Sequence, residues 1–392
     1  MAERMGGEMT FTATERVSFG RPAAQVIAEQ VARMDARRVF VLASDTLRTK
    51  TDEIARIEKA LGSRHAGTWS GMPPHAPRTS VLAAADAARE AEADLIVTVG
   101  GGSVTDAGKI VPLLLKHDVR SVEAFEPLHI YVDESGEVIN PLEIGPDIRV
   151  ICVPTGLSGA EFHPLSGATD EVTMHKQGYE HRMMASVMVV LDPAITVHTP
   201  EWLWLSTGIR AVDHAVETLA SHKSHDFANG LASSALRLLA AGLKGVKADP
   251  TDLEARQRCQ TGTWLSMISI IGGVPMGASH AIGHILGGTC NVPHGYCSCV
   301  MSPAVLAWNA RYDASRQPLI SACLGRPDLD ASSALDAFIR DLGMPRTLRE
   351  VNVSEDQFQK VADYTLLDIW GRTNPRPVQS ADDIMEILRM AA

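Results

Sequence analysis

The amino-acid sequence predicts an α/β fold made of two domains, an α/β domain at residues 1–198 and an all-helical domain at residues 199–392. Two observations lead to this prediction. In the first half, short runs of apolar, β-prone residues alternate with amphipathic helical segments, which is the pattern of a parallel sheet covered by helices on both sides. After about Pro200, almost every segment has helical periodicity and is rich in Ala, Leu and Met.

Local signals define the elements of the first half. Gly20 ends an alternating run, Pro22 suits the first turn of a helix, and the continuous apolar run 38–43 is typical of a strand buried on both faces. The expected strands are 10–19, 38–43, 67–69, 95–99, 149–153 and 187–191, with a small hairpin at 130–139, and the expected helices are 22–34, 52–61 and 80–92. In such a sheet, ligands bind beyond the carboxyl ends of the strands.

One stretch combines a strand, a glycine turn and the start of a helix. The apolar run 95–99 is followed by Gly100, Gly101 and Gly102, which allow a sharp turn and close approach of a ligand to the backbone. Ser103 suits a helix N-cap, with Asp106 three residues later in the position of a capping box. Free N–H groups and the positive end of the helix dipole predict a phosphate site here, with a tight turn that binds no ligand as the alternative.

The bulk properties favour a small ligand over a polymeric one. The chain of 392 residues has a formal net charge of -11 and no basic cluster, which argues against nucleic acid as the main partner. No signal peptide and no apolar run long enough for a bilayer is evident, so we expect no membrane partner and a cytoplasmic location. The six cysteines form no CxxC pair and are expected to be reduced thiols.

Histidines mark a second candidate site in the helical half. Arg210 and His214 are four residues apart and share one face of a helix, and so do His280 and His284. His294 follows in a turn-like stretch. Three histidines brought together could hold a divalent metal that keeps an open position for substrate. Without further information, a site and ordinary structural histidines are equally good interpretations.

These residues together resemble the iron-containing (group III) alcohol dehydrogenases, which share a fold with dehydroquinate synthase and glycerol dehydrogenase. The resemblance covers nearly the whole chain and implies a dinucleotide-binding domain, a helical domain, a cleft between them for NAD(P) and substrate, and a homodimer. It rests on the glycine turn with its helix to Lys109, the loop from Pro154 and Thr155 to Glu161, Asp192-Pro193, the helix around His214, and the set His280, His284 and His294.

The resemblance also assigns roles to single residues. It implies that His214, His280 and His294 match three metal ligands, and that His284 matches a histidine of proton relay near the nicotinamide. Ser44 aligns with the acidic residue that usually bonds the adenosine ribose, so we favour NADH over NADPH only weakly. The cofactor-binding residues expected from this match are Ser44, Gly100, Gly101, Gly102, Ser103, Asp106, Thr155 and Ser158.

One position departs from the family pattern. The fourth metal ligand is an aspartate four residues before the first ligand histidine, and here that position is Arg210. A guanidinium stays protonated and cannot ligate a cation. At ~4 Å and an effective dielectric of about 20, two unit charges repel by roughly 4 kcal/mol, and a divalent ion doubles this. We therefore expect no metal, unless Arg210 swings away and Asp213 takes its place. The maleylacetate reductase branch departs at the same aspartate and is regarded as metal-independent.

The leading hypothesis is a metal-independent, NAD(P)H-dependent reductase of a small keto/enol acid, of the type that converts maleylacetate to 3-oxoadipate in aromatic-compound degradation. Arg210 would stabilise the developing oxygen charge or clamp a carboxylate, with His280 or His284 as proton donor. Substrate contacts are expected from Arg210, His214 and His294, and less firmly from Lys176 or Arg376. The alternatives are a metal-dependent alcohol or aldehyde dehydrogenase, a carbocyclic lyase that uses NAD transiently, and an Arg210 that only forms an ion pair with Asp213 or Glu217.

Overall fold

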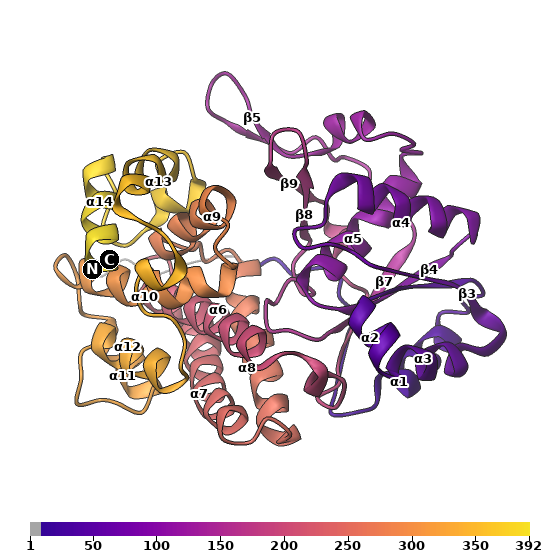
Figure 1. The fold of residues 1–392 in the computed structure, drawn as a ribbon, viewed down its shortest axis with the longest axis horizontal. Helices are drawn as coiled ribbons and strands as arrows, with labels where there is room; N and C mark the ends of the chain where they lie inside the picture. The colour runs from indigo at the N-terminus through magenta and orange to yellow at the C-terminus, as the bar shows by residue number, and fades with distance from the viewer. Residues whose placement is uncertain (1–8) are drawn as a thin grey trace, which may run out of the picture. The chain divides into compact units, whose positions relative to one another are not determined.

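The computed structural model describes residues 9–392, which fold into two compact units. The first unit is Phe11–His198, and the second is Thr199–Ala392, with which Met9 and Thr10 group. Figure 1 shows the first unit in indigo to magenta around the sheet strands, and the second as helices coloured from magenta-red to yellow. The α/β and all-helical characters predicted from the sequence are thereby confirmed.

The first unit is built on a parallel sheet. Its six described strands have the order β1-β10-β7-β4-β2-β3, and every neighbouring pair is parallel. Because β3 and β4 lie on opposite sides of β2, the connections after β2 and β3 leave the sheet in opposite directions. In parallel sheets, ligands bind beyond the carboxyl ends of the strands at such a point, here β2 and β4. The strands are β1 (Arg16–Phe19), β2 (Val39–Ala43), β3 (His65–Ser70), β4 (Leu95–Gly100), β7 (Arg149–Pro154) and β10 (Met188–Leu191).

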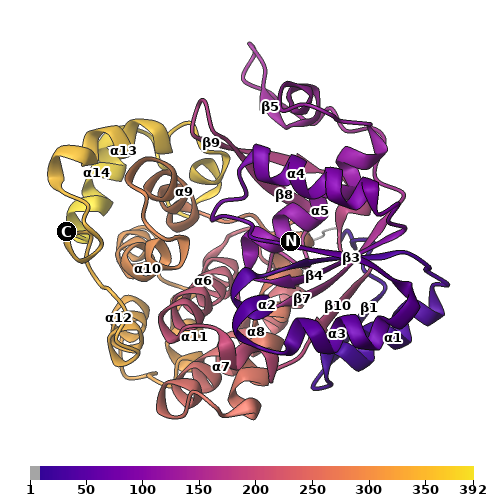
Figure 2. The same ribbon diagram turned by 45° about the vertical axis from the view of Figure 1, so that its right-hand side comes forward.

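Helices cover both faces of this sheet, as Figure 2 shows with α4 and α5 on one side and α1 and α3 on the other. Successive side chains along a strand point to opposite faces of the sheet, so alternate residues belong to two different hydrophobic cores. Phe40 and Leu42 belong to the core under α4 and α5, whereas Val39, Val41 and Ala43 belong to the core under α1 and α3. The helices of this unit are α1 (Ala23–Arg33), α2 (Asp45–Lys50), α3 (Glu53–Leu61), α4 (Arg78–Glu90) and α5 (Gly102–Lys116).

Several local expectations need correction. The first strand begins at Arg16 instead of residue 10, and α2 was not expected because it is only six residues long. A second hairpin, β8 (Leu165–Asp170) with β9 (His175–Glu180), also gave no clear sequence signal. The small hairpin expected at 130–139 is present as the strands β5 (Tyr131–Val132) and β6 (Val138–Ile139).

The second unit packs its helices around α6, whose side chains are buried from Gly208 onwards apart from the half-buried Arg210. The described helices are α6 (Glu201–Ala220), α7 (Asp226–Ala248), α8 (Leu253–Ile271), α9 (Ala278–Cys290), α10 (His294–Ala310), α11 (Gln317–Cys323), α12 (Ala331–Asp341), α13 (Phe358–Thr365) and α14 (Ala381–Met390). Short 3₁₀ turns complete the chain: η1 (Gly62–Arg64), η2 (Glu123–Leu128), η3 (Arg182–Met184), η4 (Ile195–His198), η5 (Arg349–Val351), η6 (Glu355–Gln357) and η7 (Ile369–Thr373). None of the helices in residues 9–392 combines the length and the apolar character that crossing a lipid bilayer requires.

Candidate functional site

The glycine turn lies at the carboxyl end of β4, where the sheet topology predicts ligand binding. The N-cap of α5 is Gly101, not Ser103, so the predicted capping box of Ser103 with Asp106 is wrong. The helix starts two residues early because glycine accepts the sharp turn without a side-chain cap. A Cβ on Gly100 would lie 2.9 Å from Cγ2 of Val104, whereas a Cβ on Gly101 would meet nothing within 4 Å. The space beside Gly101 and the first turn of α5 is therefore open to a phosphate group.

Two further segments predicted to bind the cofactor adjoin this turn. The backbone N–H of Thr155 donates to the carbonyl of Gly100 at 2.9 Å, and a Cβ on Gly102 would lie 3.6 Å from Oγ of Ser158. Ser44 follows the neighbouring strand β2, and its N–H donates to the carbonyl of Val99 at 2.8 Å. The parallel strands β2, β4 and β7 thus bring the predicted residues of all three segments to one edge of the sheet.

Buried charges hold the loops around the turn. Lys109 of α5 is fully buried and donates to the carbonyls of Ala160, His163 and Leu165 at 2.7–2.9 Å, which anchors the loop after β7 to α5. Burial lowers the pKa of this lysine. Lys176 of β9 donates to Oδ2 of Asp106 at 2.7 Å, so the structure gives Lys176 a partner in the first unit and the Asp106 carboxylate a role in fixing the β8–β9 hairpin.

In the helical unit, α6, α9 and α10 bring the predicted histidines and Arg210 together. A Cβ on Gly295 would lie 2.6 Å from the carbonyl carbon of Ser206, so the first turn of α10 presses directly on the backbone of α6. The ring of His294 lies over Gly287 of α9, where a Cβ would be 2.8 Å from its Cε1. The rings of His214 and His280 are 5.0 Å apart between centroids, and those of His284 and His294 are 6.4 Å apart.

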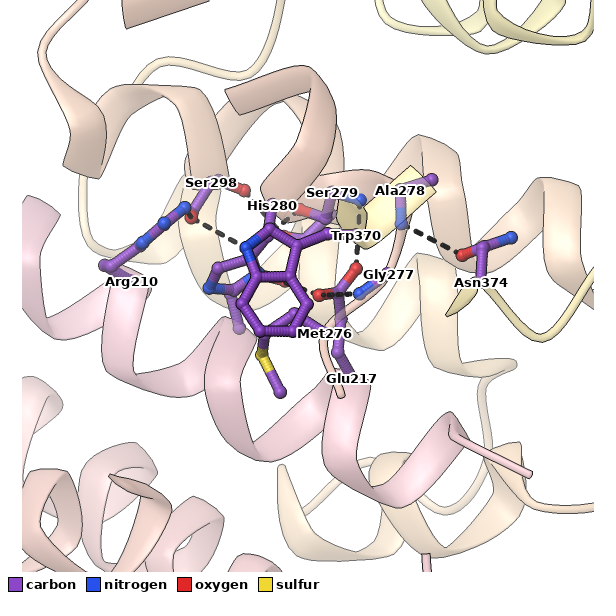
Figure 3. Close-up of polar contacts among 12 residues, drawn as sticks. Arg210, Glu217, Met276, Gly277, Ala278, Ser279, His280, Ser298, Trp370 and Asn374 are labelled. Atoms are coloured by element: carbon purple, nitrogen blue, oxygen red, sulfur yellow. Dashed lines mark hydrogen bonds and ion pairs between the residues drawn. The ribbon is translucent and has the colours of Figure 1, made fainter. Parts of the chain in front are cut away.

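Glu217 of α6 caps the start of α9 and orients His280, as Figure 3 shows. Its carboxylate accepts from the backbone N–H groups of Gly277 at 2.8 Å and Ser279 at 2.9 Å, while Oδ1 of Asn374 accepts from the N–H of Ala278 at 3.1 Å. Nδ1 of His280 lies 2.8 Å from Oε2 of Glu217. With Nδ1–H donating to this carboxylate, Nε2 of His280 carries a lone pair. Nε2 is buried and has no hydrogen-bond partner among the described residues.

Arg210 is connected to a second buried acid through a serine. Oγ of Ser298 is 2.8 Å from Oδ2 of Asp213 and 3.3 Å from Nη1 of Arg210. Because a serine hydroxyl has one proton and donates it to Asp213, it accepts from Arg210. Oγ of Ser279 also donates to Oδ2 of Asp213, at 2.7 Å. Within the described part of the chain, Arg210 forms no ion pair within 4.0 Å, so the expected direct pair with Asp213 or Glu217 is absent.

Burial dominates the electrostatics of this cluster. Burial, and then the neighbouring Glu217, raise the pKa of Asp213 to about 8, although Arg210 and the two serines oppose the shift. Burial likewise raises the pKa of Glu217 to about 7, opposed by the N–H groups of α9 and by Arg210. Burial, followed by the charges of Arg210 and His284, holds the pKa of His280 well below its usual range. His280 is therefore a neutral acceptor at physiological pH, which does not favour it as the proton donor.

The sequence analysis missed Asp368 and the orienting role of Glu217. Nδ1 of His284 lies 2.9 Å from Oδ2 of Asp368, which precedes η7. No local pattern marks Asp368, since it lies 84 residues from its partner. Arg376, which was considered for substrate binding, instead stacks on Trp308 at 3.7 Å and donates to its carbonyl at 3.1 Å.

The donor set does not fit the metal that the resemblance implies. The guanidinium of Arg210 lowers the pKa of His280 by its charge and lies beside α9, with Nη1 3.5 Å from an added Cβ on Gly283, and it cannot ligate a cation. Asp213, Glu217 and His280 do present ligand atoms within 4.8 Å of one another. However, Asp213 lies on the Nδ1 side of His280, 3.5 Å away, where Nδ1 already bonds Glu217. Oδ2 of Asp213 accepts hydrogen bonds from two serine hydroxyls, and both oxygens of Glu217 accept from backbone N–H groups. Asp213 therefore does not replace the aspartate ligand that Arg210 displaces.

Comparisons with known proteins cover both units. Two family profiles match the chain, "Iron-containing alcohol dehydrogenase" over residues 14–193 and "Fe-containing alcohol dehydrogenase family, C-terminal" over residues 204–392. The chain is 32% identical to dehydrogenase FUM7 of Gibberella moniliformis, with 96% of each chain covered. It is also 32% identical to maleylacetate reductase 2 of Cupriavidus pinatubonensis, with 96% of this chain and 94% of the relative covered.

A solved structure with the same fold is that of maleylacetate reductase from Rhizobium sp. strain MTP-10005. It has a TM-score of 0.82 and 26% identity, and 99% of this chain and 98% of that chain are covered. These similarities extend over both units, and the names of the relatives agree on redox chemistry but not on a substrate. The chain is an oxidoreductase and belongs to the iron-containing alcohol dehydrogenase family.

Proposed function

We propose that this protein is a metal-independent, NAD(P)H-dependent reductase of a small keto or enol carboxylic acid, of the type that reduces maleylacetate to 3-oxoadipate in the degradation of aromatic compounds. The observation that carries the proposal is the guanidinium of Arg210 among the site histidines. A guanidinium has five N–H donors, and only one of them is bonded within the described residues, to Ser298. The others remain available for a carboxylate or for an oxygen that gains negative charge.

The proposed reaction adds a hydride to carbon and a proton to the neighbouring carbon or oxygen. NADH, when bound at the glycine turn, supplies the hydride. Arg210 holds the substrate oxygen and stabilises its charge without help from a metal. His280, kept neutral by burial and oriented by Glu217, accepts a hydrogen bond from the substrate at Nε2. His284, which is partly exposed, donates the proton.

The remaining expectations belong to the same proposal. NADH is the favoured cofactor, although Ser44 lacks the carboxylate that would repel a 2′-phosphate. Arg48 lies one turn after Ser44 in α2 and donates to Oγ of Ser70. Its positive charge could pair with the 2′-phosphate of NADPH, so NADPH is the second cofactor to test. A homodimer is proposed from the resemblance to the iron-containing alcohol dehydrogenases, and a role in aromatic-compound degradation from the likeness to the maleylacetate reductases.

The decisive test is NADH oxidation at 340 nm with maleylacetate, other keto acids and simple aldehydes, with and without EDTA. We expect turnover of keto acids that is unchanged by EDTA, and less than stoichiometric metal by mass spectrometry. Losing a hydrogen bond to a charged group costs about 1.5–3 kcal/mol, or roughly 10- to 150-fold in rate. Arg210→Gln should lower kcat/KM for keto acids by this factor with an unchanged Tm.

Arg258→Gln is the matched control, because Arg258 is exposed on α8 and, among residues 9–392, pairs only with Glu254. It should leave kcat/KM unchanged. If Arg210→Gln lowers Tm but leaves kcat unchanged, Arg210 is structural and the proposal is wrong.

A metal-dependent alcohol or aldehyde dehydrogenase is the second candidate. One observation favours it: Nε2 of His280 is buried without a partner among the described residues and lies beside the ring of His214, as a ligand nitrogen would. About one tightly bound ion per chain, with aldehyde turnover lost in EDTA, would establish this alternative.

A further inference from the structure

The site histidines of α9 are held in the same way by two different elements. His280 and His284 are one helical turn apart, and each presents Nδ1 to a carboxylate from outside the helix. Glu217 of α6 holds His280, and Asp368, just before η7, holds His284. In both pairs the carboxylate decides which ring nitrogen carries the proton.

The two pairs differ in their access to water. The side chain of His280 is 4% exposed, whereas that of His284 is 36% exposed, with Asp368 at 14%. A reductase consumes one proton in every turnover, so its proton donor must be reloaded from solvent. Of these two histidines, His284 alone has the exposure for this. Its Nε2 has no hydrogen-bond partner within residues 9–392.

Asp368 is prepared for this task by its own contacts. Its Oδ1 accepts from the backbone N–H of Trp370 at 2.8 Å, which fixes the carboxylate and leaves Oδ2 for His284 at 2.9 Å. Both oxygens act as acceptors, so Nδ1–H of His284 is the donor of the shared hydrogen bond.

Other bonds also hold η7 against α9. Oγ1 of Thr373 donates to the carbonyl of Met276 at 2.6 Å, and Asn374 accepts from the N–H of Ala278. Figure 3 shows Asn374 at the first turn of α9. These two bonds hold the segment against α9 in addition to the contact of Asp368 with His284, so the orientation of His284 can be tested separately from docking.

We propose that Asp368 is the positioning residue of the proton donor. It keeps the proton of the neutral His284 ring on Nδ1 and thereby makes Nε2 the nitrogen that takes a proton from water and delivers it to the reduced substrate. The Nε2–H bond breaks as the new C–H or O–H bond of the product forms. This inference rests on the proposed reductase function for its chemistry, but the orientation of His284 can be measured without any substrate.

The first experiment reads the tautomer directly. The ¹⁵N side-chain resonances of histidine-labelled protein are compared in wild type and Asp368→Asn, with the His284 signals assigned by their loss in His284→Ala. We expect the proton on Nδ1 in wild type. The amide of Asp368→Asn can turn its NH₂ toward Nδ1, so the proton should move toward Nε2. Thr373→Val removes another anchor of the same segment and should leave the tautomer unchanged.

The second experiment is a double-mutant cycle on keto-acid reduction. His284→Ala should lower kcat on the order of 10²- to 10⁴-fold, as loss of a general acid does. Asp368→Asn should lower kcat roughly tenfold or more with little change in KM, and should add nothing further in the His284→Ala background. Asp363→Asn is the charge control and should have no effect, because it removes an exposed carboxylate of α13 whose one partner in the described part of the chain is Gln359.

Additive effects in the cycle, or a tautomer that does not respond to Asp368→Asn, would overturn the proposal. If Asp368→Asn lowers the Tm, Asp368→Glu is the variant to measure. It keeps a carboxylate beside His284, so it should restore the proton on Nδ1 and part of kcat. If no keto acid oxidises NADH, the reductase assignment fails, and the ¹⁵N tautomer still decides whether Asp368 orients His284.

Discussion

At the scale of single residues, Asp213 and Glu217 illustrate how two acids on one helix obtain different tasks. Both are fully enclosed by the helical unit, and burial raises the pKa of each carboxyl, to about 8 and about 7. The two oxygens of Glu217 accept backbone N–H groups of α9. Asp213 uses only Oδ2, and Oδ1 has no partner among the described residues. Asp213 and Glu217 both line a cavity of about 10 Å³, which has room for about one water molecule.

The substitution Asp213→Asn should become more stabilising as the pH rises. Folding raises the pKa of the Asp213 carboxyl from 3.8 to about 8, so the folded chain holds this proton more tightly than the unfolded chain. The free energy of unfolding therefore falls as the pH rises from about 3.8 to about 8. The asparagine does not titrate, and its carbonyl oxygen can accept both serine hydroxyls. We expect the Tm of the variant, relative to wild type, to increase between pH 5 and pH 8 in thermal melts.

Glu217→Gln should lower the Tm relative to wild type, because Glu217 accepts two backbone N–H groups of α9. Either orientation of the glutamine amide places its NH₂ against a backbone N–H of α9, which leaves a buried donor unpaired. Such a loss costs about 1–3 kcal/mol, so the Tm should fall across the same pH range. Because burial also raises the pKa of Glu217, to about 7, the deficit in Tm relative to wild type should shrink as the pH rises. A Tm equal to or above that of wild type at pH 5 would contradict this role of Glu217.

At the scale of elements, the site depends on how closely α9 and α10 approach their neighbours. Gly287 and Gly288 are adjacent in α9, but only Gly287 faces the ring of His294, 2.8 Å from its added Cβ. A Cβ on Gly288 would meet nothing within 4 Å. The two positions therefore offer a matched pair of substitutions in the same helix.

Gly287→Ala should lower activity with little loss of stability, because the ring of His294, as the end of a side chain, gives way more easily than backbone. Gly288→Ala should keep full activity and stabilise the fold by about 0.5–1 kcal/mol through its better helix propensity. Thermal melts and NADH-oxidation rates measure both effects. An active Gly287→Ala variant would show that the position of His294 is unimportant.

At the scale of the whole molecule, cofactor binding and carbonyl chemistry are assigned to different units. The glycine turn lies in the unit Phe11–His198, and Arg210 with the site histidines lies in the unit Thr199–Ala392. Each unit has a hydrophobic core of its own. The two functions should therefore be separable by substitution.

Gly101→Val should abolish tight NADH binding without unfolding the protein. Gly101 has φ -79 and ψ -174, a conformation that other residues adopt, and its Cβ would fill the open space where we place the phosphate. Fluorescence titration should show a dissociation constant for NADH at least about tenfold higher, with an unchanged Tm. Gly100→Ala, by contrast, should lower Tm because its Cβ would press on Val104 at 2.9–3.2 Å. Arg210→Gln should keep the wild-type affinity for NADH.

Features that depend on residues close together in the chain could be predicted from the amino-acid sequence. The alternation of apolar runs predicted the parallel sheet and its helices, three successive glycines predicted the turn at the end of β4, and spacings of four placed Arg210 with His214 and His280 with His284. These are local properties, because hydrophobic periodicity and backbone freedom act within a few residues.

The tertiary structure alone decided which charges meet. The carboxylates of Glu217 and Asp368 lie 63 and 84 residues from the histidines they bond, and Asp213 bonds Ser298 over 85 residues. No short pattern encodes such pairs, since they exist only when α6, α9, α10 and η7 pack together. Packing therefore decides which ring nitrogen of each histidine carries the proton. It also decides that His280 is buried as an acceptor while His284 is exposed enough to donate a proton.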